Sequence, residues 1–444
     1  MEEKILSLIE QGKYFDARNE ISKLNVVDAA HLFEKVEQKQ FLMLFRFLPK
    51  DFSSDVFTHM SSELQKYLID SFTDEEVIGI FDDLYFDDAV DFLEEMPANV
   101  VKRILKSTNE ETRILINQFL NYPADSAGSL MTIEYVDLKK EMTVSQALHY
   151  IKLIGIDKRT INICFVMDSS RILEGKVSLR KLILSDENEL VADIMEKDVI
   201  SVNTHDDQEE VAGLFRKYDY YVMPVVDMEN RLVGIITVDD ILDVIDREAT
   251  EDIHKMAAIQ PSETEYLKTS NWALTMHRLP WLMILMISAT LTGAIIQKYE
   301  NALETVIILT AFIPMLMDTA GNSGSQTSSL IIRGLALEQI HTQDIFKVIG
   351  KEFSVGALSG AVLALFNFLR IYFIAQTSFV VALTVSLTLF ATVVLAKITG
   401  GILPIVAKKL NLDPAVMAAP LITTLVDVVA LVIYFNLATL LMHI

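Results

Sequence analysis

Hydrophobic and polar residues follow different patterns in successive parts of the chain. In residues 1–125, apolar side chains recur at helical spacing and glycine and proline are scarce, which predicts an all-helical domain. Segments that open near Leu24, Leu48, Phe72 and Met96 form a degenerate repeat of about 24 residues. The repeat predicts a small solenoid of stacked helical hairpins.

Residues 126–245 change to short β-rich runs that alternate with helical patterns. The run Val166–Asp168 and the positions after it recur 59 residues later, beginning at Val225. Each copy predicts the order strand, turn, strand, helix. We therefore expect two small α+β domains in tandem, over residues 126–187 and 188–245.

The last part of the chain is strongly apolar. An acidic connector helix is expected over residues 246–270, and residues 271–444 contain five segments of about 20 apolar residues, the length that spans a bilayer as a helix. The five segments cover residues 279–297, 305–333, 354–374, 379–399 and 415–441. Pro314 is expected to kink the second segment, and the polar, glycine-rich run from Asp318 to Thr327 is expected to interrupt it.

The predicted fold class is therefore that of a multidomain membrane protein. It combines an all-α helical-repeat N-terminal domain, an α+β domain pair, a connector helix and a five-helix α transmembrane domain.

Charge divides the chain as hydropathy does. The 444 residues carry a net charge of −23, but residues 1–270 contain 29 basic and 53 acidic residues, whereas residues 271–444 contain 9 and 8. So acidic a surface argues against nucleic-acid binding, because phosphate is repelled, and favours cations or a basic partner. The one cysteine, Cys164, excludes an internal disulfide.

Two observations indicate how the chain meets the membrane. The residues that follow Met1 lack the basic and apolar order of a signal peptide, so the acidic part is expected to stay in the cytosol. The basic residues at the segment ends expected to face the cytosol are Arg278, Arg333, Lys347, Lys351, Lys397, Lys408 and Lys409, whereas Arg370, late in the third segment, lies toward the other side. By the positive-inside rule they predict a multi-pass protein of the cytoplasmic (inner) membrane, with its N-terminus cytosolic and its C-terminus outside.

Asp427 lies midway along the fifth apolar segment, where an ionised carboxylate is costly unless it faces water, a cation or a partner. Thr423 lies one turn earlier, and Asn322 and Gln326 share the same i, i+4 spacing in the second segment. These oxygen ligands suit a hard cation such as Mg²⁺ or Ca²⁺, and a hydrated ion better than a stripped one. The alternatives are a structural carboxylate at Asp427 and a second segment built for close helix packing.

Acidic residues of the cytosolic part cluster in three places. They are Asp82, Asp83, Asp87, Asp88 and Asp91; Asp206, Asp207, Glu209 and Glu210; and Asp239, Asp240, Asp243, Asp246, Glu248, Glu251 and Asp252. Like charges that share a helix face repel unless cations bridge them, so the set predicts weak divalent-cation sites that couple domains. For any single acid the alternative is a solvated helix face. No Walker A, GxSxG or HExxH string occurs, which argues against an enzyme.

The order of domains and several strings resemble the MgtE family of Mg²⁺ channels, and the α+β pair resembles a tandem of CBS domains. The strings are Asp207–Val211, Thr237–Asp240, Ala249–Lys255, Gly321–Gln326 and the segment around Asp427. The resemblance implies a homodimer in the lipid bilayer, with a pore between the subunits along the second and fifth segments. It also implies that Asp427 is the selectivity carboxylate that holds a hydrated Mg²⁺.

The same resemblance implies a set of cytosolic sensor acids. They are Asp87 and Asp91 in the N-terminal domain; Asp207, Glu209, Asp219, Asp240 and Asp243 in the second CBS domain; Glu248, Glu251 and Asp252 in the connector; and Asp413 at the cytosolic mouth of the fifth segment. Arg216 stands where the family can have a small residue, which argues against a backbone ligand at this position. Some relatives bind ATP in the CBS pair.

These features predict a Mg²⁺-selective channel or transporter under negative feedback. At high cytosolic Mg²⁺, bound ions would bridge the acidic faces and close the pore; at low Mg²⁺, repulsion would separate them. The alternative is a proton-coupled secondary divalent-cation transporter in which Asp427 carries the proton. A ligand-regulated membrane enzyme is disfavoured by the missing catalytic constellation.

Overall fold

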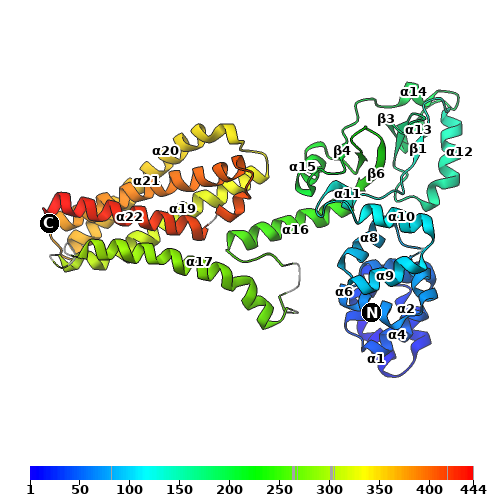
Figure 1. The fold of residues 1–444 in the computed structure, drawn as a ribbon, viewed down its shortest axis with the longest axis horizontal. Helices are drawn as coiled ribbons and strands as arrows, with labels where there is room; N and C mark the ends of the chain where they lie inside the picture. Colours follow the sequence, from blue (N-terminus) through cyan, green and yellow to red (C-terminus); the bar gives the residue numbers. More distant parts are fainter. Residues whose placement is uncertain are drawn as a thin grey trace. The chain divides into compact units, whose positions relative to one another are not determined.

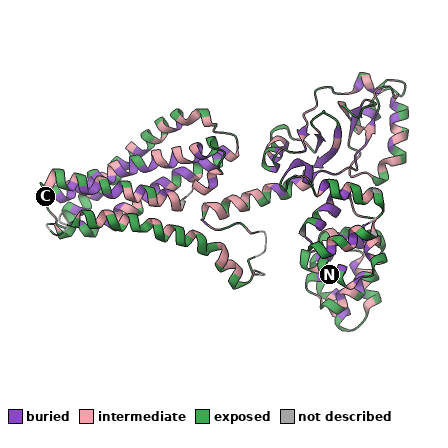
Figure 2. Cartoon of the chain, in the orientation of Figure 1, coloured by how far each residue is buried: buried purple, intermediate pink, exposed green. Residues whose placement is uncertain are grey.

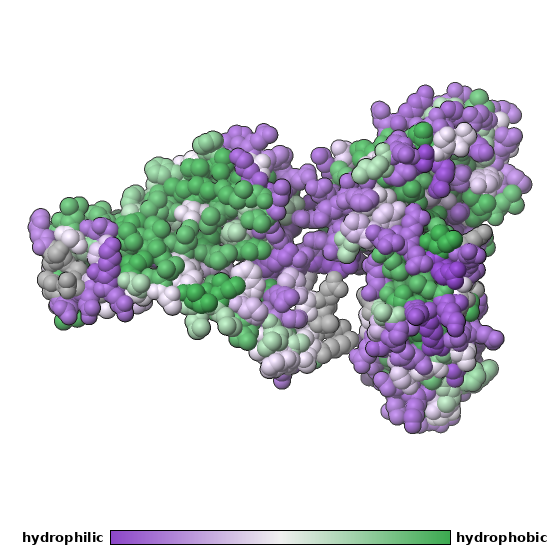
Figure 3. Space-filling view, in the orientation of Figure 1, coloured by the Kyte–Doolittle hydropathy of each residue, from purple (hydrophilic) through white to green (hydrophobic). Residues whose placement is uncertain are grey.

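The computed structural model describes residues 1–443 with the exception of 82, 263–265, 268, 301–303, 305 and 418. Its contacts divide the chain into two compact units, Met1–Ile245 and Asp246–Ile444, which we describe separately (Figure 1). In Figure 3 hydrophobic residues cover much of the visible face of the second unit, whereas the first unit presents mostly hydrophilic residues.

The first unit begins with a stack of short helices. They are α1 (Glu2–Glu10), α2 (Tyr14–Ile21), α3 (Val26–Glu34), α4 (Gln38–Arg46), α5 (Lys50–Thr58), α6 (Ser62–Ser71), α7 (Asp74–Phe81), α8 (Phe86–Glu95), α9 (Ala98–Ser107) and α10 (Glu110–Phe119). Helices α3 to α10 form four consecutive pairs, and the corresponding helices of successive pairs begin 24 residues apart. The predicted helical repeat is therefore confirmed. Helices this short are marginal alone, so their stability comes from packing.

One buried apolar cluster joins this helical stack to the domains that follow it. The cluster runs from Ile5 in α1 through Phe119 in α10, and it includes Met131 and Phe215 from the α+β part of the chain (Figure 2). Since a shared core removes apolar surface of both parts from water, hydrophobic burial contributes to the contact between the N-terminal domain and the α+β pair.

The α+β pair consists of two copies of one small unit. The first copy contains α11 (Ala127–Leu130), β1 (Asp137–Leu138), α12 (Val144–Ile154), a 3₁₀ turn η1 (Gly155–Asp157), β2 (Ile163–Met167), β3 (Leu173–Ser178) and α13 (Leu179–Leu184). The second contains α14 (Val191–Ile194), β4 (Val202–Asn203), α15 (Gln208–Tyr218), β5 (Val222–Val226) and β6 (Leu232–Thr237). In each copy a parallel pair, β1 with β2 or β4 with β5, is extended by an antiparallel third strand.

The strand register confirms the predicted repeat. Val166 pairs with Gly175 in the first copy, and Val225 pairs with Gly234 in the second, with a register shift at the same place in both. Both glycines allow close approach of another segment: a Cβ atom on Gly175 would lie 2.9 Å from the carbonyl oxygen of Glu196, and one on Gly234 would lie 2.8 Å from that of Thr132. The two copies therefore use the same backbone contact.

The connector helix differs from its prediction. Helix α16 runs from Val238 to Met256, so it begins within the second α+β copy and ends well before residue 270. Its end has two local causes. Ala258 has the left-handed φ of 53°, and Pro261 follows, which cannot continue a helix.

The second unit contains long helices. They are α17 (Asn271–Lys298), a 3₁₀ segment η2 (Ile307–Phe312), α19 (Ile313–Ala336), a 3₁₀ turn η3 (Thr342–Asp344), α20 (Ile345–Leu369), a π-turn η4 (Arg370–Ile374), α21 (Phe379–Lys409), a 3₁₀ turn η5 (Pro414–Met417) and α22 (Ala419–Met442). Within the described residues, four segments are long and apolar enough to cross a membrane: those of α17, α20, α21 and α22. Helix α19, the fifth long helix, packs against α21 and α22 and carries the polar run.

Two expectations about α19 were wrong. The helix is continuous through the run from Asp318 to Thr327, and Pro314 lies in its first turn, where proline is tolerated, instead of kinking it. The glycines of the run permit close helix packing: a Cβ atom on Gly321 would lie 2.8 Å from Cγ2 of Thr423. Another on Gly324 would lie 2.6 Å from Cγ2 of Ile422.

Replacing Gly400 with alanine should destabilise the second unit. Its new Cβ atom would lie 2.3 Å from the carbonyl oxygen of Gly324, a backbone atom that no side-chain rotation can move away. Overpacking of this kind costs about 1–3 kcal/mol. The matched control is Gly350→Ala in α20, where nothing lies within 4 Å of the added carbon. Thermal unfolding in detergent should show a lower midpoint for Gly400→Ala alone; equal midpoints would contradict the packing argument.

Candidate cation sites

Four carboxylates of the first unit surround one guanidinium. We call the group formed by Arg159, Asp87, Asp88, Asp239 and Asp240 the acidic joint. Arg159 lies 2.9 Å from Asp239, 3.4 Å from Asp240, 3.6 Å from Asp88 and 3.9 Å from Asp87. The joint links the first turn of α8 to the first turn of α16, with the arginine supplied by the loop after α12.

Asp87 is the most buried member of the joint. Only 4% of its surface is exposed, and within the described structure neither carboxylate oxygen has a hydrogen-bond partner. Burial, with repulsion from Asp88, raises the pKa of Asp87 to about 7. Burial likewise raises the pKa of Asp88 to about 6 and that of Asp240 to about 6. The joint therefore holds more negative charge than its arginine neutralises, and it favours an added proton or cation.

The other sensor acids predicted in the first unit are exposed. Asp91 follows Asp87 by one turn of α8, and Asp243 follows Asp239 by one turn of α16. Two acids act as caps of α15: Asp207 accepts a hydrogen bond from the backbone N–H of Glu209 at 2.9 Å, whereas the other cap, Asp219, ends the helix in the left-handed conformation. The structure therefore does not bring the caps together. Asp82 lies outside the described residues.

A second charged group lies within the second unit. Lys255, near the end of α16, forms ion pairs with Glu251 and with Asp413, the latter at 2.6 Å. Asp413 also accepts a hydrogen bond from the backbone N–H of Ala415 at 2.7 Å, which caps the turn before α22. Burial and the charge of Asp413 raise the pKa of Asp252, and Glu248 lies one turn before Asp252 on α16. Four predicted sensor acids therefore lie on or beside the end of this helix.

The four predicted pore residues occupy α19 and α22. Asn322 and Gln326 are exposed on α19, and Thr423 of α22 packs against Gly321. Asp427 is half-buried, and its Oδ1 atom has no hydrogen-bond partner in the described structure. Asp318, which was not predicted as a site residue, precedes Asn322 by four residues, and its charge acts on Asp427.

We call Asp318, Asn322 and Gln326 the polar stripe of α19. Its members recur every four residues and are exposed in the single chain, so oxygen-bearing side chains face outward from this long helix of the second unit. The glycines Gly321 and Gly324 lie on the buried side of the same helix. The close-packing interpretation is confirmed for the glycine face, whereas the pore-facing interpretation of the polar face stays a prediction.

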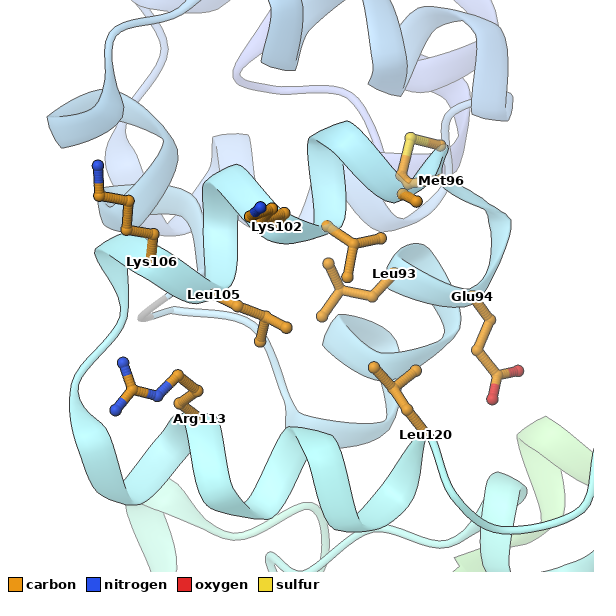
Figure 4. Close-up of a pocket in the computed structure, with 10 residues that line it drawn as sticks. Leu93, Glu94, Met96, Lys102, Leu105, Lys106, Arg113 and Leu120 are labelled. Atoms are coloured by element: carbon orange, nitrogen blue, oxygen red, sulfur yellow. The ribbon is translucent and has the colours of Figure 1, made fainter.

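A groove between α8, α9 and α10 has the opposite charge character (Figure 4). Apolar residues such as Leu93 and Leu105 line it, together with the basic residues Lys102, Lys106 and Arg113. Three cationic side chains make it unsuitable for a metal ion. Across the described residues, no three or more His, Cys, Asp or Glu side chains are arranged to hold a metal ion as they stand.

Two basic residues at the acid groups were not predicted as site residues. Arg159 lies in the polar run Asp157-Lys158-Arg159, where no spacing distinguishes it from a surface residue. Lys255 follows Glu251 by four residues, a spacing that does indicate an ion pair, but nothing local shows its contact with Asp413.

Comparisons with known proteins agree with this architecture. Residues 313–437 match a family described as a divalent cation transporter, MgtE; residues 24–125 match the MgtE intracellular N domain; and residues 191–247 match the CBS domain. Long apolar helices that match the transporter family, preceded by an MgtE N domain and a CBS domain, thus place the chain among divalent-cation transporters of the membrane and not among enzymes.

Relatives along the whole chain identify the family. The chain is 36% identical over 451 residues to the magnesium transporter MgtE of Thermus thermophilus, with 100% of both chains covered. It is 35% identical over 440 residues to that of Bacillus subtilis, covering 99% of this chain and 97% of the relative. The chain therefore belongs to the MgtE family, which confirms the resemblance.

Two solved structures match the first unit. One is the soluble part of a magnesium transporter (TM-score 0.53, 31% identity, covering 56% of this chain and 98% of that one). The other is the cytosolic domain of the Mg²⁺ channel MgtE in complex with ATP (TM-score 0.53, 34% identity, covering 55% and 100%). The predicted fold class, with its helical N-terminal domain and CBS pair, is confirmed.

Without divalent cations, the stability of the first unit should fall as pH rises from about 4 to about 7. Asp87, Asp88 and Asp240 have raised pKa values in the folded state, so the folded state binds more protons than the unfolded state and loses stability as they dissociate. Hydrogen exchange of the α8 amides in the full-length protein would measure this. Asp87→Asn should flatten the pH dependence, whereas the exposed control Asp219→Asn should not; an unchanged slope in Asp87→Asn would contradict the assignment.

Proposed function

We propose that this protein is a Mg²⁺-selective channel or transporter of the cytoplasmic membrane, gated by cytosolic Mg²⁺. The observation that carries the proposal is the environment of Asp427 in α22. Its Oδ1 atom has no hydrogen-bond partner in the described structure, and the negative charge of Asp318 on the neighbouring helix α19 acts on it. Two carboxylates so placed favour a cation between them. The names of the relatives support Mg²⁺ as that cation.

The polar stripe of α19 supports a pore formed by two subunits. An exposed row of Asp318, Asn322 and Gln326 is unfavourable in hydrocarbon, so we infer that it faces water or a second copy of the chain. A homodimer would place two stripes and two copies of Asp427 around one path. Because Mg²⁺ keeps several of its waters, a path lined by carboxylate, amide and hydroxyl oxygens suits the hydrated ion.

For the pore we assign Asp427, Thr423, Asn322 and Gln326. As cytosolic sensors we assign Asp87, Asp91, Asp207, Glu209, Asp219, Asp240, Asp243, Glu248, Glu251, Asp252 and Asp413. The domains are assigned as 1–125, 126–187, 188–245, 246–270 and 271–444, with the N-terminus cytosolic and the C-terminus outside. ATP binding by the CBS pair is a further proposal, which rests on the complex of the related cytosolic domain.

The sensor residues fit divalent cations chemically. They supply carboxylate oxygens, the ligands that Mg²⁺ prefers, and Asp87 contributes two buried oxygens without hydrogen-bond partners among the described residues. Ion binding would offset the repulsion within the acidic joint and around Asp252 and Asp413. Since bound ions stabilise only the arrangement that brings these acids together, high Mg²⁺ would favour one closed state.

Asp427→Asn should reduce selective Mg²⁺ flux in proteoliposomes by at least tenfold, because the amide keeps the shape but removes the charge that attracts the ion. The matched control is Thr424→Val on the same helix, whose hydroxyl is already bonded to the carbonyl oxygen of Pro420 and should be dispensable. Flux and selectivity that survive in Asp427→Asn would refute the pore assignment. A Mg²⁺ flux that requires a proton gradient would instead favour the coupled transporter.

Cytosolic Mg²⁺ should inhibit its own influx. In proteoliposomes with a constant Mg²⁺ concentration on the non-cytosolic side, Mg²⁺ influx should decrease as the Mg²⁺ concentration on the cytosolic side is raised. Asp252→Asn should shift the half-inhibiting concentration upward, since one ligand of the closed state is lost. Influx that is independent of cytosolic Mg²⁺ would overturn the gating proposal but leave the pore assignment standing.

A further inference from the structure

We infer that Arg159 is a tethered cation that takes the place of a divalent ion in the acidic joint, so that this joint closes without Mg²⁺. The inference deepens the proposed gating and rests on it, because it states which contact of the closed arrangement does not depend on the ion. Control by Mg²⁺ then falls mainly on the remaining acids, among them Asp252 and Asp413.

The geometry of the joint places the guanidinium where a bridging ion would have to be. Its nitrogens approach two carboxylates of α8 and two of α16 within 2.9 to 3.9 Å, and no other basic side chain forms an ion pair with these four acids in the described structure. A planar guanidinium with five N–H donors suits several carboxylates at once. A divalent ion at the same place would be repelled by Arg159, so the two cations compete for this position, and the arginine takes over the role proposed for an ion at Asp87 and Asp240 while it is present.

Arg159 is held in position by its own surroundings. Its backbone N–H donates to the carbonyl oxygen of Glu134 at 2.9 Å, and its guanidinium lies 4.9 Å from the centre of the Tyr85 ring. Only 18% of its side chain is exposed. A cation attached to a fixed backbone loses less freedom on binding than a free ion does, so the joint can form at any ion concentration.

The neutralisation is incomplete. One positive charge faces four carboxylates, and the buried oxygens of Asp87 lack hydrogen-bond partners among the described residues. The joint is therefore closed by Arg159 but remains electrostatically unfavourable. Removing the arginine should leave repulsion that only added cations can offset, which makes an ion-independent contact into an ion-dependent one.

The experiment measures a distance across the joint in the full-length protein. Spin labels on Lys66→Cys in the N-terminal domain and Lys181→Cys in the first CBS domain report the separation by pulsed dipolar spectroscopy, with and without Mg²⁺. Both positions are exposed, whereas the native Cys164 is buried and burial raises its pKa to about 12, so it should not be labelled. The test variant is Arg159→Gln. The matched control is Arg231→Gln, an exposed arginine paired with Glu229.

With Arg159 present, and in the Arg231→Gln control, the distance distribution should be equally narrow in EDTA and in Mg²⁺. For Arg159→Gln it should be at least twice as broad in EDTA and narrow again in excess Mg²⁺, which also shows that the variant folds. Arg159→Lys keeps the positive charge but lacks the planar guanidinium with its several N–H donors. Its distance distribution in EDTA should have an intermediate width. A narrow distribution for Arg159→Gln in EDTA would overturn the inference, and so would one that stays broad in Mg²⁺.

Flux measurements separate this inference from the proposed function. Arg159→Gln should require several-fold more cytosolic Mg²⁺ for half-inhibition, because its closed state lacks a cation that the native chain supplies. If Mg²⁺ does not inhibit the native protein, the gating proposal fails, while the distance measurement still decides whether Arg159 holds the joint.

Discussion

Carboxylates that lie close together need a counter-charge, and this requirement recurs in both units of the chain. In the first unit Asp87 and its neighbours gather around a single arginine; in the second, Glu251 and Asp413 gather around a single lysine. In each group the acidic side chains outnumber the single basic side chain, so a net negative charge remains. Both groups therefore keep an excess of negative charge in the folded protein. Their stability should depend on the concentration of any cation that can bind and neutralise this charge.

The membrane unit meets the same requirement in another way. No basic side chain pairs with Asp427 in the described structure, and its interacting charge, Asp318, has the same sign. The glycines of α19 allow α21 and α22 to pack closely, which holds these carboxylates near each other without a salt bridge. In the proposed pore, a mobile Mg²⁺ ion would supply the counter-charge, and because it is not part of the chain it could also leave.

The sequence predicted the architecture well because periodicity and composition are local signals. The 24-residue helical repeat, the two α+β copies and the five long membrane-unit helices were all read from spacing alone. Patterns failed where the outcome depends on contacts distant in the chain. The run around Gly321 was expected to break a helix, yet it packs against Thr423, which is more than 100 residues away. Arg159 was missed for the same reason, since its partners come from α8 and α16.

The length and continuity of helix α16 bear on how cation binding could be coupled to a conformational change. It carries Asp239 in its first turn and Lys255 near its end, so one continuous helix joins a contact of the acidic joint to the contact with Asp413. Sixteen residues of helix span about 24 Å and do not stretch. In the proposed gating, a displacement at one end of this helix would be transmitted to the other as a movement of the whole helix, so that a change at Asp239 and a change at Lys255 could not occur independently.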